Sequence, residues 1–346
     1  MRSFLGLKLQ IPVLLILAGA LGCAGQVDPR TGREIPPGKL PPNYAQSKDV
    51  PLDPKLKAAA DQELVKALHN SDPNVRAHAI EAVREATGDA HAKEIVAALS
   101  DSDPLVVYSA CLAAGDLRLK EAKEPLSGLV ENKDSGVRVV ARYALHRLGN
   151  YKYSHDLEEL AKDPEPSVRG TTAMVLGMIG DRTATNVLKP LRVDINPAVR
   201  QQASVSLWQL GNAQGLADLV GLTVSPYQDD KKVVLLGLAG PHNHNVVQHI
   251  RPALTDDAPE VCLVAARGMG MLGCDEGYGV AQKGVKSEDP RQRVLAALAL
   301  GAIGRSDAQE MLRKLLADGN ADVRVAAAEA ILQLKAHFVD ECSTGQ

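Results

Sequence analysis

Three histidines, His242, His244 and His249, lie within eight residues of one another. Imidazole nitrogens are common ligands of zinc and copper, so this segment could hold a metal ion if a turn brings the rings together. No carboxylate or cysteine stands beside them in the sequence to complete a ligand set. The alternative is a polar turn with His249 on a helix surface. The sequence favours that interpretation, and we expect no metal ion and no cofactor.

The cysteines also form no recognisable set of reactive groups. Their spacings fit neither a disulfide framework nor a zinc site. Cys262 and Cys274 would lie about 18 Å apart on one helix, at ~1.5 Å per residue, which is too far for a bond. We expect both to be small buried side chains. The five cysteines are Cys23, Cys111, Cys262, Cys274 and Cys342.

No catalytic residue can be assigned from the sequence. No glycine-rich loop follows a strand pattern, and no Ser/His/Asp or Cys/His arrangement has a recognisable spacing. The formal net charge is −3. It would become −5 without residues 1–22, which contain Arg2 and Lys8 but no acidic residue. Such a chain lacks the basic stripe that phosphate contacts need, so nucleic acid is excluded as a partner.

The first 22 residues are predicted to be an export signal. Arg2 and Lys8 give a positive start, and the apolar run from Ile11 to Leu21 is followed by small residues. That run is too short to span a bilayer comfortably.

The end of this segment, Leu17-Ala-Gly-Ala-Leu-Gly-Cys23, resembles the lipobox of bacterial lipoproteins. The resemblance implies that Cys23 becomes the mature N-terminus and carries fatty-acyl chains such as palmitate. Several chains on one cysteine would give lasting membrane anchorage. The residue after Cys23 is not Asp, which by the same resemblance implies an outer-membrane lipoprotein facing the periplasm. The alternative is ordinary signal cleavage after Ala20 or Ala24, with Cys23 incidental.

Residues 23–53 are predicted to be a disordered, proline-rich linker behind this cysteine. Six prolines alternate there with glycine and charged residues, and almost nothing is available for burial. An extended chain of this kind reaches about 3.1 Å per residue, which is on the order of 90 Å in total.

From residue 54 to residue 335 the chain repeats every 31 residues. Apolar residues recur one position before and three, seven and ten positions after each point of the period, which is the spacing of a helix face. A second apolar column lies twelve positions upstream, so each unit is predicted to be helix–turn–helix, and nine units fill the array. Residues 336–346 form a polar tail. The points of the period are Arg76, Val107, Arg138, Arg169, Arg200, Lys231, Cys262, Arg293 and Arg324.

The consensus Asp-Pro-x-Val-Arg-x-x-Ala-x-x-Ala-Leu-x-x-Leu-Gly resembles the HEAT repeat, in the short subtype named for phycobilisome lyases. The resemblance implies an all-α fold, an α-solenoid whose second helices line the concave side. It also implies an Asp–Arg ladder between turns, interrupted at Val107, Lys231 and Cys262. The ladder would pair Asp72 with Arg76, Asp134 with Arg138, and Asp289 with Arg293.

The resemblance leaves an enzymatic alternative open. Deoxyhypusine hydroxylases of this class hold iron through His-Glu pairs, and no histidine of this chain is followed by Glu. A lyase-like or metal- or chromophore-handling protein is the alternative, and it depends on the repeat subtype alone.

Positions one, five and eight residues after each point of the period should face the concave side. In units two to eight most of them are apolar, whereas the end units carry Glu81, Arg84 and Glu329. An apolar stripe of this kind is typical of a binding groove. Alternatively, tight curvature makes these side chains bury one another, or the array is a passive spacer. We expect an exported, lipid-anchored scaffold that binds a protein or peptide in this groove, through Tyr108, Tyr143, Met174 and Trp208.

Overall fold

Each 31-residue unit folds into a pair of antiparallel helices. The computed structural model describes residues 50–336 and residue 342. These residues form α-helices and short 3-10 helices and contain no strand. The predicted signal 1–22, Cys23 and the linker up to residue 49 lie outside the described residues, as does most of the predicted tail. None of the helices described is long and apolar enough to cross a bilayer.

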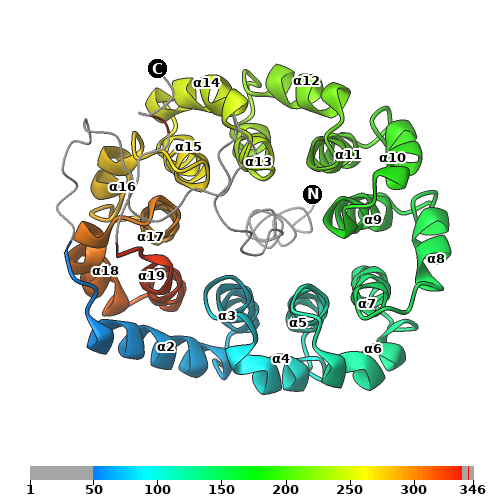
Figure 1. The fold of residues 1–346 in the computed structure, drawn as a ribbon, viewed down its shortest axis with the longest axis horizontal. Coiled ribbons are helices and arrows are strands. Elements are labelled where there is room, and N and C mark those ends of the chain that lie inside the picture. The colour runs from blue at the N-terminus through cyan, green and yellow to red at the C-terminus, as the bar shows by residue number, and fades with distance from the viewer. Residues whose placement is uncertain (1–49, 337–341, 343–346) are drawn as a thin grey trace, which may run out of the picture.

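The units are arranged as two concentric layers (Figure 1). The first helices form the outer layer: α2 (Pro54–Leu68), α4 (Ala92–Ala98), α6 (Lys123–Leu129), α8 (Tyr153–Leu160), α10 (Thr185–Leu191), α12 (Ala213–Leu222), α14 (Val247–Ile250), α16 (Tyr278–Gly284) and α18 (Gln309–Leu316). The second helices form the inner layer: α3 (Pro73–Ala86), α5 (Pro104–Asp116), α7 (Ser135–Arg147), α9 (Pro166–Ile179), α11 (Pro197–Gln209), α13 (Gln228–Ala239), α15 (Pro259–Met271), α17 (Pro290–Ile303) and α19 (Ala321–Gln333).

The inner helices begin where the repeated acidic or amide residue can cap them. The side chain of Asp72 accepts a hydrogen bond from the backbone N–H of Asn74 at 2.9 Å, and Asn196 caps α11 in the same way. A proline in the first turn costs no hydrogen bond there. The column of small residues three positions after each point of the period is buried, as at Ala79 and Ala141. The predicted all-α solenoid is therefore confirmed.

The arginine ladder differs from the prediction. Arg76 pairs with Asp101 of the next unit at 2.8 Å, because Asp72 is already occupied as a helix cap. Arg169 with Asp194 and Arg293 with Asp318 repeat the arrangement 25 residues apart. The position of Lys231 is not an interruption, since its ammonium group reaches Asp256 at 2.6 Å. At Cys262 the thiol donates to the carbonyl of Asp256, a partner equivalent to one that the arginines use.

The two ends of the array meet and close it into a ring, because α19 packs on α2 and α3 (Figure 1). The sequence did not predict this closure. Nor did it predict that Val50–Asp53, assigned to the linker, would form a clasp. In the clasp the N–H of Val50 donates to Ser306 Oγ at 3.0 Å, and Asp53 binds Gln309 and Arg313.

Two ion pairs continue the closure beside the clasp. Arg324 of α19 donates to Glu63 of α2 at 2.6 Å. The ring of His78 in α3 lies 3.2 Å from the carboxylate of Asp322. Together with the clasp these contacts form the seam of the ring.

Glycines let the inner helices approach closely enough to bend the array into a circle. A Cβ atom added at Gly115 would lie 2.8 Å from Ala144 Cα, and one at Gly301 would lie 2.7 Å from Ala330 Cα. Both positions are eight residues after a point of the period and face the next inner helix. The inner layer is therefore shorter around than the outer layer, with roughly 40° of rotation per unit for nine units in a circle.

A disulfide bond joins Cys274 to Cys342, with 5.1 Å between their Cα atoms. The prediction that the cysteines form no disulfide was wrong, because the ring fold places the tail against the turn after α15. Cys111 and Cys262 are free thiols.

Candidate interaction surface

The residues predicted to bind a partner lie in the wall of the ring. Tyr143, Met174 and Trp208 are each at most 6% exposed, and Tyr108 is half-buried. The hydroxyl of Tyr143 donates to Asp116, and the indole N–H of Trp208 donates to the carbonyl of Leu238 at 3.0 Å. These contacts join neighbouring inner helices. The structure thus favours the packing alternative, and a binding role for the four residues stays a prediction.

Closure of the ring brings together charges that the sequence placed at opposite ends of the array. Arg84 of α3 pairs with Asp116 and, at 3.0 Å, with Glu85. Arg267 of α15 reaches Glu85 at 3.5 Å, although its helix belongs to unit seven. Glu81 accepts a hydrogen bond from Ser109 at 3.1 Å.

Burial controls the protonation of this inner cluster. Loss of hydration raises the pKa of Glu81 to about 8. Burial also raises the pKa of Glu329 to about 8, and the neighbouring charge of Glu85 adds to the effect. Both carboxyl groups therefore hold a proton at neutral pH, which lowers the cost of burying so many acidic side chains. Arg267 was missed from the sequence, although it occupies the same repeat position as Glu81 and Glu329.

A different set of side chains is exposed on the edge of the ring where the turns within units lie. Because paired helices are antiparallel, all turns within units lie on one edge, and all turns between units lie on the other. The turns of units five and six carry four apolar side chains that are between 70% and 91% exposed. These are Val193, Ile195, Val224 and Tyr227, and we call them the apolar turns.

The equivalent positions of the other units carry mostly polar or small residues. Seven positions before the point of the period, where units five and six have Val193 and Val224, the other units have His69, Ser100, Glu131, Lys162, Thr255, Lys286 and Ala317. Five positions before it, where unit five has Ile195, the others have Ser71, Ser102, Lys133, Pro164, Pro226, Asp257, Glu288 and Gly319. The apolar turns are therefore a local departure from the pattern, and the sequence contained this signal.

The turn of unit five is held rigidly from both sides. Asp194 accepts two hydrogen bonds from Arg169 of unit four, at 2.7 and 2.8 Å. Those bonds from Arg169 hold the pKa of Asp194 below its usual range. The carbonyls of Asp194 and Ile195 accept from Arg200 at 2.8 and 3.1 Å. Ile195 is therefore presented to solvent on a turn that loses little freedom on binding.

The turn of unit six is ordered by different contacts. Ser225 donates to Asp230 at 2.8 Å, and the carbonyl of Asp230 accepts from Gln201 of unit five at 3.1 Å. Tyr227 occupies the N-cap position of α13, where its side chain makes no capping hydrogen bond. Most other units have a capping residue there, such as Asp72. The chain therefore carries an exposed aromatic ring at a position where a helix cap would be more stable.

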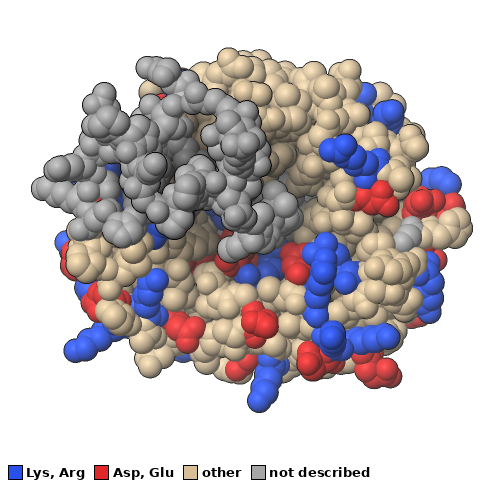
Figure 2. All heavy atoms as spheres, viewed as in Figure 1, with Lys and Arg blue, Asp and Glu red and all other residues tan. Residues whose placement is uncertain are grey.

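The surrounding surface differs in charge from the rest of the ring. In the view of Figure 2, Lys, Arg, Asp and Glu gather over the half that contains α2 to α8, and few lie over α12 and α13. The turn between these two helices carries Val224 and Tyr227. Helices of neighbouring units pack about 8–10 Å apart, so the apolar turns form one continuous patch. Exposed aromatic and branched aliphatic groups on rigid turns are suited to burial against another protein.

The comparison with protein families identifies the repeat. A family profile described as HEAT repeats matches residues 62–146, 155–239 and 247–333. The chain belongs to the HEAT-repeat family. The resemblance noted in the sequence is thereby confirmed for most of this HEAT-repeat protein, including the units that carry Lys231 and Cys262. No curated protein matches the chain.

Several solved structures share the fold at low identity. The complex of CpcE and CpcF of phycocyanin lyase from Nostoc sp. PCC7120 is 24% identical, covers 68% of this chain and 92% of its own, and has a TM-score of 0.34. Human deoxyhypusine hydroxylase in complex with glycerol is 18% identical, with 72% and 98% covered and a TM-score of 0.37. Kap121p bound to Pho4p is 13% identical, with 81% and 37% covered and a TM-score of 0.35. These likenesses concern the helical repeat alone.

Proposed function

We propose that this HEAT-repeat ring is an exported, lipid-anchored scaffold of the bacterial cell envelope that binds a protein partner through the apolar turns. The observation that carries the proposal is the exposure of Val193, Ile195, Val224 and Tyr227 at repeat positions where other units are mostly polar or small. No chemistry is required of such a protein, only a rigid shape and exposed anchors. The predicted lipoprotein signal ending at Cys23 supports the location, an outer-membrane lipoprotein facing the periplasm.

The position of the clasp favours a protein over a lipid surface as the occupant of the apolar turns. Val50 and Asp53 bind Ser306 and Gln309, which follow the turn between units eight and nine. The chain that leads to Cys23 therefore leaves from the edge opposite to the apolar turns. Asp229 and Asp230 also lie beside Tyr227, and carboxylates would repel an anionic membrane. An apolar surface of a second protein, with basic residues at its border, meets both conditions.

The test compares two positions that are equivalent in the repeat. A photo-crosslinking side chain is placed at Ile195 and, as the control, at Ser102, which is also exposed. We expect one defined partner to crosslink in cells from position 195 and not from position 102. The same partner, once identified and purified, should lose at least about tenfold in affinity for Ile195→Asp, since each tenfold corresponds to about 1.4 kcal/mol.

Tyr227→Asn gives a variant that separates folding from binding. Asn caps α11 and α19 at the equivalent positions, so this substitution should cap α13 and raise the free energy of unfolding by about 0.5–1 kcal/mol. It should also weaken the partner. A variant that is more stable but still binds with full affinity contradicts the proposed surface and leaves the passive spacer as the function.

The anchor has an independent test. The protein is extracted from membranes, and the mass of its N-terminal peptide is measured. We expect a peptide that begins at Cys23 and carries acyl chains, and Cys23→Ala should release the protein from the membrane. An unmodified peptide that begins at Ala24 contradicts lipid anchoring without affecting the proposed partner surface.

A further inference from the structure

Two turns between units and the tail bring three metal-binding side chains together. His244, Cys274 and Cys342 each offer one ligand atom, and these atoms all lie within 4.8 Å of one another. His244 is exposed, Cys274 is buried and Cys342 is half-buried. The histidine segment lacks a nearby cysteine in the sequence, and the fold supplies two.

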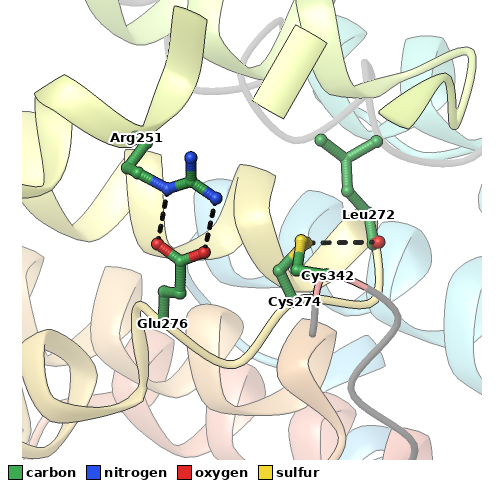
Figure 3. The surroundings of a disulfide bond; sticks show 5 residues. All are labelled: Arg251, Leu272, Cys274, Glu276 and Cys342. Atoms are coloured by element: carbon green, nitrogen blue, oxygen red, sulfur yellow. Dashed lines mark hydrogen bonds and ion pairs between the residues drawn. A yellow bond between two sulfur atoms is a disulfide. The ribbon is translucent and has the colours of Figure 1, made fainter. Parts of the chain in front are cut away.

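The backbone fixes two of the three ligands before anything binds. The N–H of Cys274 donates to the carbonyl of Met269 at 2.9 Å, in the cap that ends α15. The ring of His242 lies 2.8 Å from the carbonyl of Met271, which holds the histidine turn against the end of the same helix. In Figure 3 the adjacent pair of Arg251 and Glu276, with two contacts of 2.7 Å, braces the turn that carries Cys274.

We propose that the thiol form of His244, Cys274 and Cys342 is a redox-gated binding site for a thiophilic cation, with Zn²⁺ as its representative. In the oxidised form the Cys274–Cys342 disulfide leaves no thiolate to bind a cation. Exchange with a dithiol reductant breaks this bond. The reductant gives two electrons and two protons to the two sulfur atoms and becomes a disulfide itself. Binding of Zn²⁺ then releases the two thiol protons to solvent.

The ligand set and its spacing fit this class of cation. Zinc binds thiolate sulfur at about 2.3 Å and imidazole nitrogen at about 2.0–2.1 Å, so ligand atoms around it lie roughly 3.5 Å apart. The three atoms need to move by only about 1 Å to reach that spacing. Two thiolates and one imidazole select zinc or Cu⁺ over magnesium and calcium. With three protein ligands, the fourth position would be open to water.

The site does not depend on the proposed partner surface. Its turns lie between units, on the edge of the ring opposite to the apolar turns. Release of the disulfide would also free the tail from unit seven, so the redox state determines whether the tail is tied to the ring by a covalent bond or through a cation.

The test uses the full-length mature protein and Co²⁺ as a spectroscopic probe for the zinc site. The protein is reduced with a phosphine, which is then removed without air, and Co²⁺ is titrated in. We expect one Co²⁺ per chain, with a thiolate-to-cobalt charge-transfer band that Zn²⁺ abolishes by displacement. The oxidised protein should show no such band. A parallel titration with Cu⁺ against a chelator of known affinity determines which cation the site prefers.

Matched variants decide whether these residues form the site. Cys342→Ser and His244→Ala should each weaken Co²⁺ binding by at least about tenfold. His249→Ala and Cys262→Ser, in the same region of the chain, should leave it unchanged. Far-UV circular dichroism and the thermal midpoint confirm that each variant is folded. The proposal is overturned if the reduced protein binds no Co²⁺, or if binding survives both Cys342→Ser and His244→Ala.

Discussion

The junction between α9 and α11 and the seam between α19 and α2 join units by different means. At the junction the chain itself runs through α10, and one ladder pair, Arg169 with Asp194, is added. At the seam no short connection exists, because residues more than 240 positions apart must find each other. Polar contacts that occur once in the chain, such as Arg324 with Glu63, are found there.

This difference separates two roles of the sequence. The repeated apolar columns allow any unit to stack on any other, so they cannot specify which two ends meet. The clasp Val50–Asp53 and the pairs Arg324–Glu63 and His78–Asp322 are specific to the seam. Repetition therefore provides the stacking, and unique polar residues provide the closure.

The largest effect should come from an internal junction. Leu207 in α11 is fully buried, and Leu207→Ala removes packing that every internal junction needs. We expect the free energy of unfolding to fall by about 2–5 kcal/mol. Denaturant unfolding measures this change, and the folded ring should keep its shape in small-angle scattering. A ring that opens in this variant without unfolding would contradict the comparison.

The next effect concerns the charged cluster that the closure brings together, and it depends on pH. The folded state keeps the carboxyl group of Glu329 protonated to about pH 8, whereas the unfolded chain releases that proton near its model value of 4.5. The folded state therefore binds more protons between these values, and its stability must fall as the pH rises through that window.

Glu329→Gln should remove most of this loss for the one residue. Gln keeps the shape and the hydrogen bond from Gln333 but cannot ionise. We expect the variant to gain up to a few kcal/mol over the wild type at pH 9, since one pKa unit is worth about 1.4 kcal/mol. At pH 4 the two proteins should be alike. Equal pH profiles from thermal unfolding would show that Glu329 is hydrated.

A smaller effect is expected where the inner helices touch. Gly301→Ala places a Cβ atom 2.7 Å from Ala330 Cα, so the backbone of α19 must shift. Overpacking of this kind costs about 1–3 kcal/mol. Gly128→Ala is the matched control, because no atom lies within 4 Å of its added Cβ. The control should be neutral or stabilising, by up to about 1 kcal/mol. Equal losses in both variants would mean that close approach does not set the curvature.

The smallest effect on stability should come from the seam itself. Arg324→Ala leaves Glu63 without its partner, and we expect a loss of about 1–2 kcal/mol. Its effect on shape should be larger than that of Leu207→Ala, because the seam has no covalent link. Small-angle scattering should show a larger radius of gyration as salt is added to the variant. Arg76→Ala, which removes an internal ladder pair, should leave the radius unchanged.

The local structure followed from the sequence because it repeats. The columns around Arg138 predicted the nine helix pairs, and Asp72 was correctly assigned as a helix cap. The same assignment explains the error in the ladder, since one carboxylate cannot both cap its own helix and serve Arg76. The aspartates 25 residues downstream, such as Asp101, were the better partners.

Contacts between distant residues could not be predicted in this way. Neither the seam nor the Cys274–Cys342 bond has a period, and each depends on the total rotation of nine units. A small error in rotation per unit accumulates around the circle, so closure is invisible to a single repeat. The inward-facing column that contains Tyr143 and Trp208 was assigned to a groove because an open array exposes it. In the ring those side chains lie in the wall.

An open array of repeats frays from its terminal units, whose outer faces lack a neighbour. A ring has no terminal unit, so local opening must begin by breaking two interfaces at once. Amide hydrogen exchange should therefore be slow and similar in α3 and α11, with no gradient toward residue 54 or residue 335. Proteases should likewise find no preferred end from which to digest the folded chain.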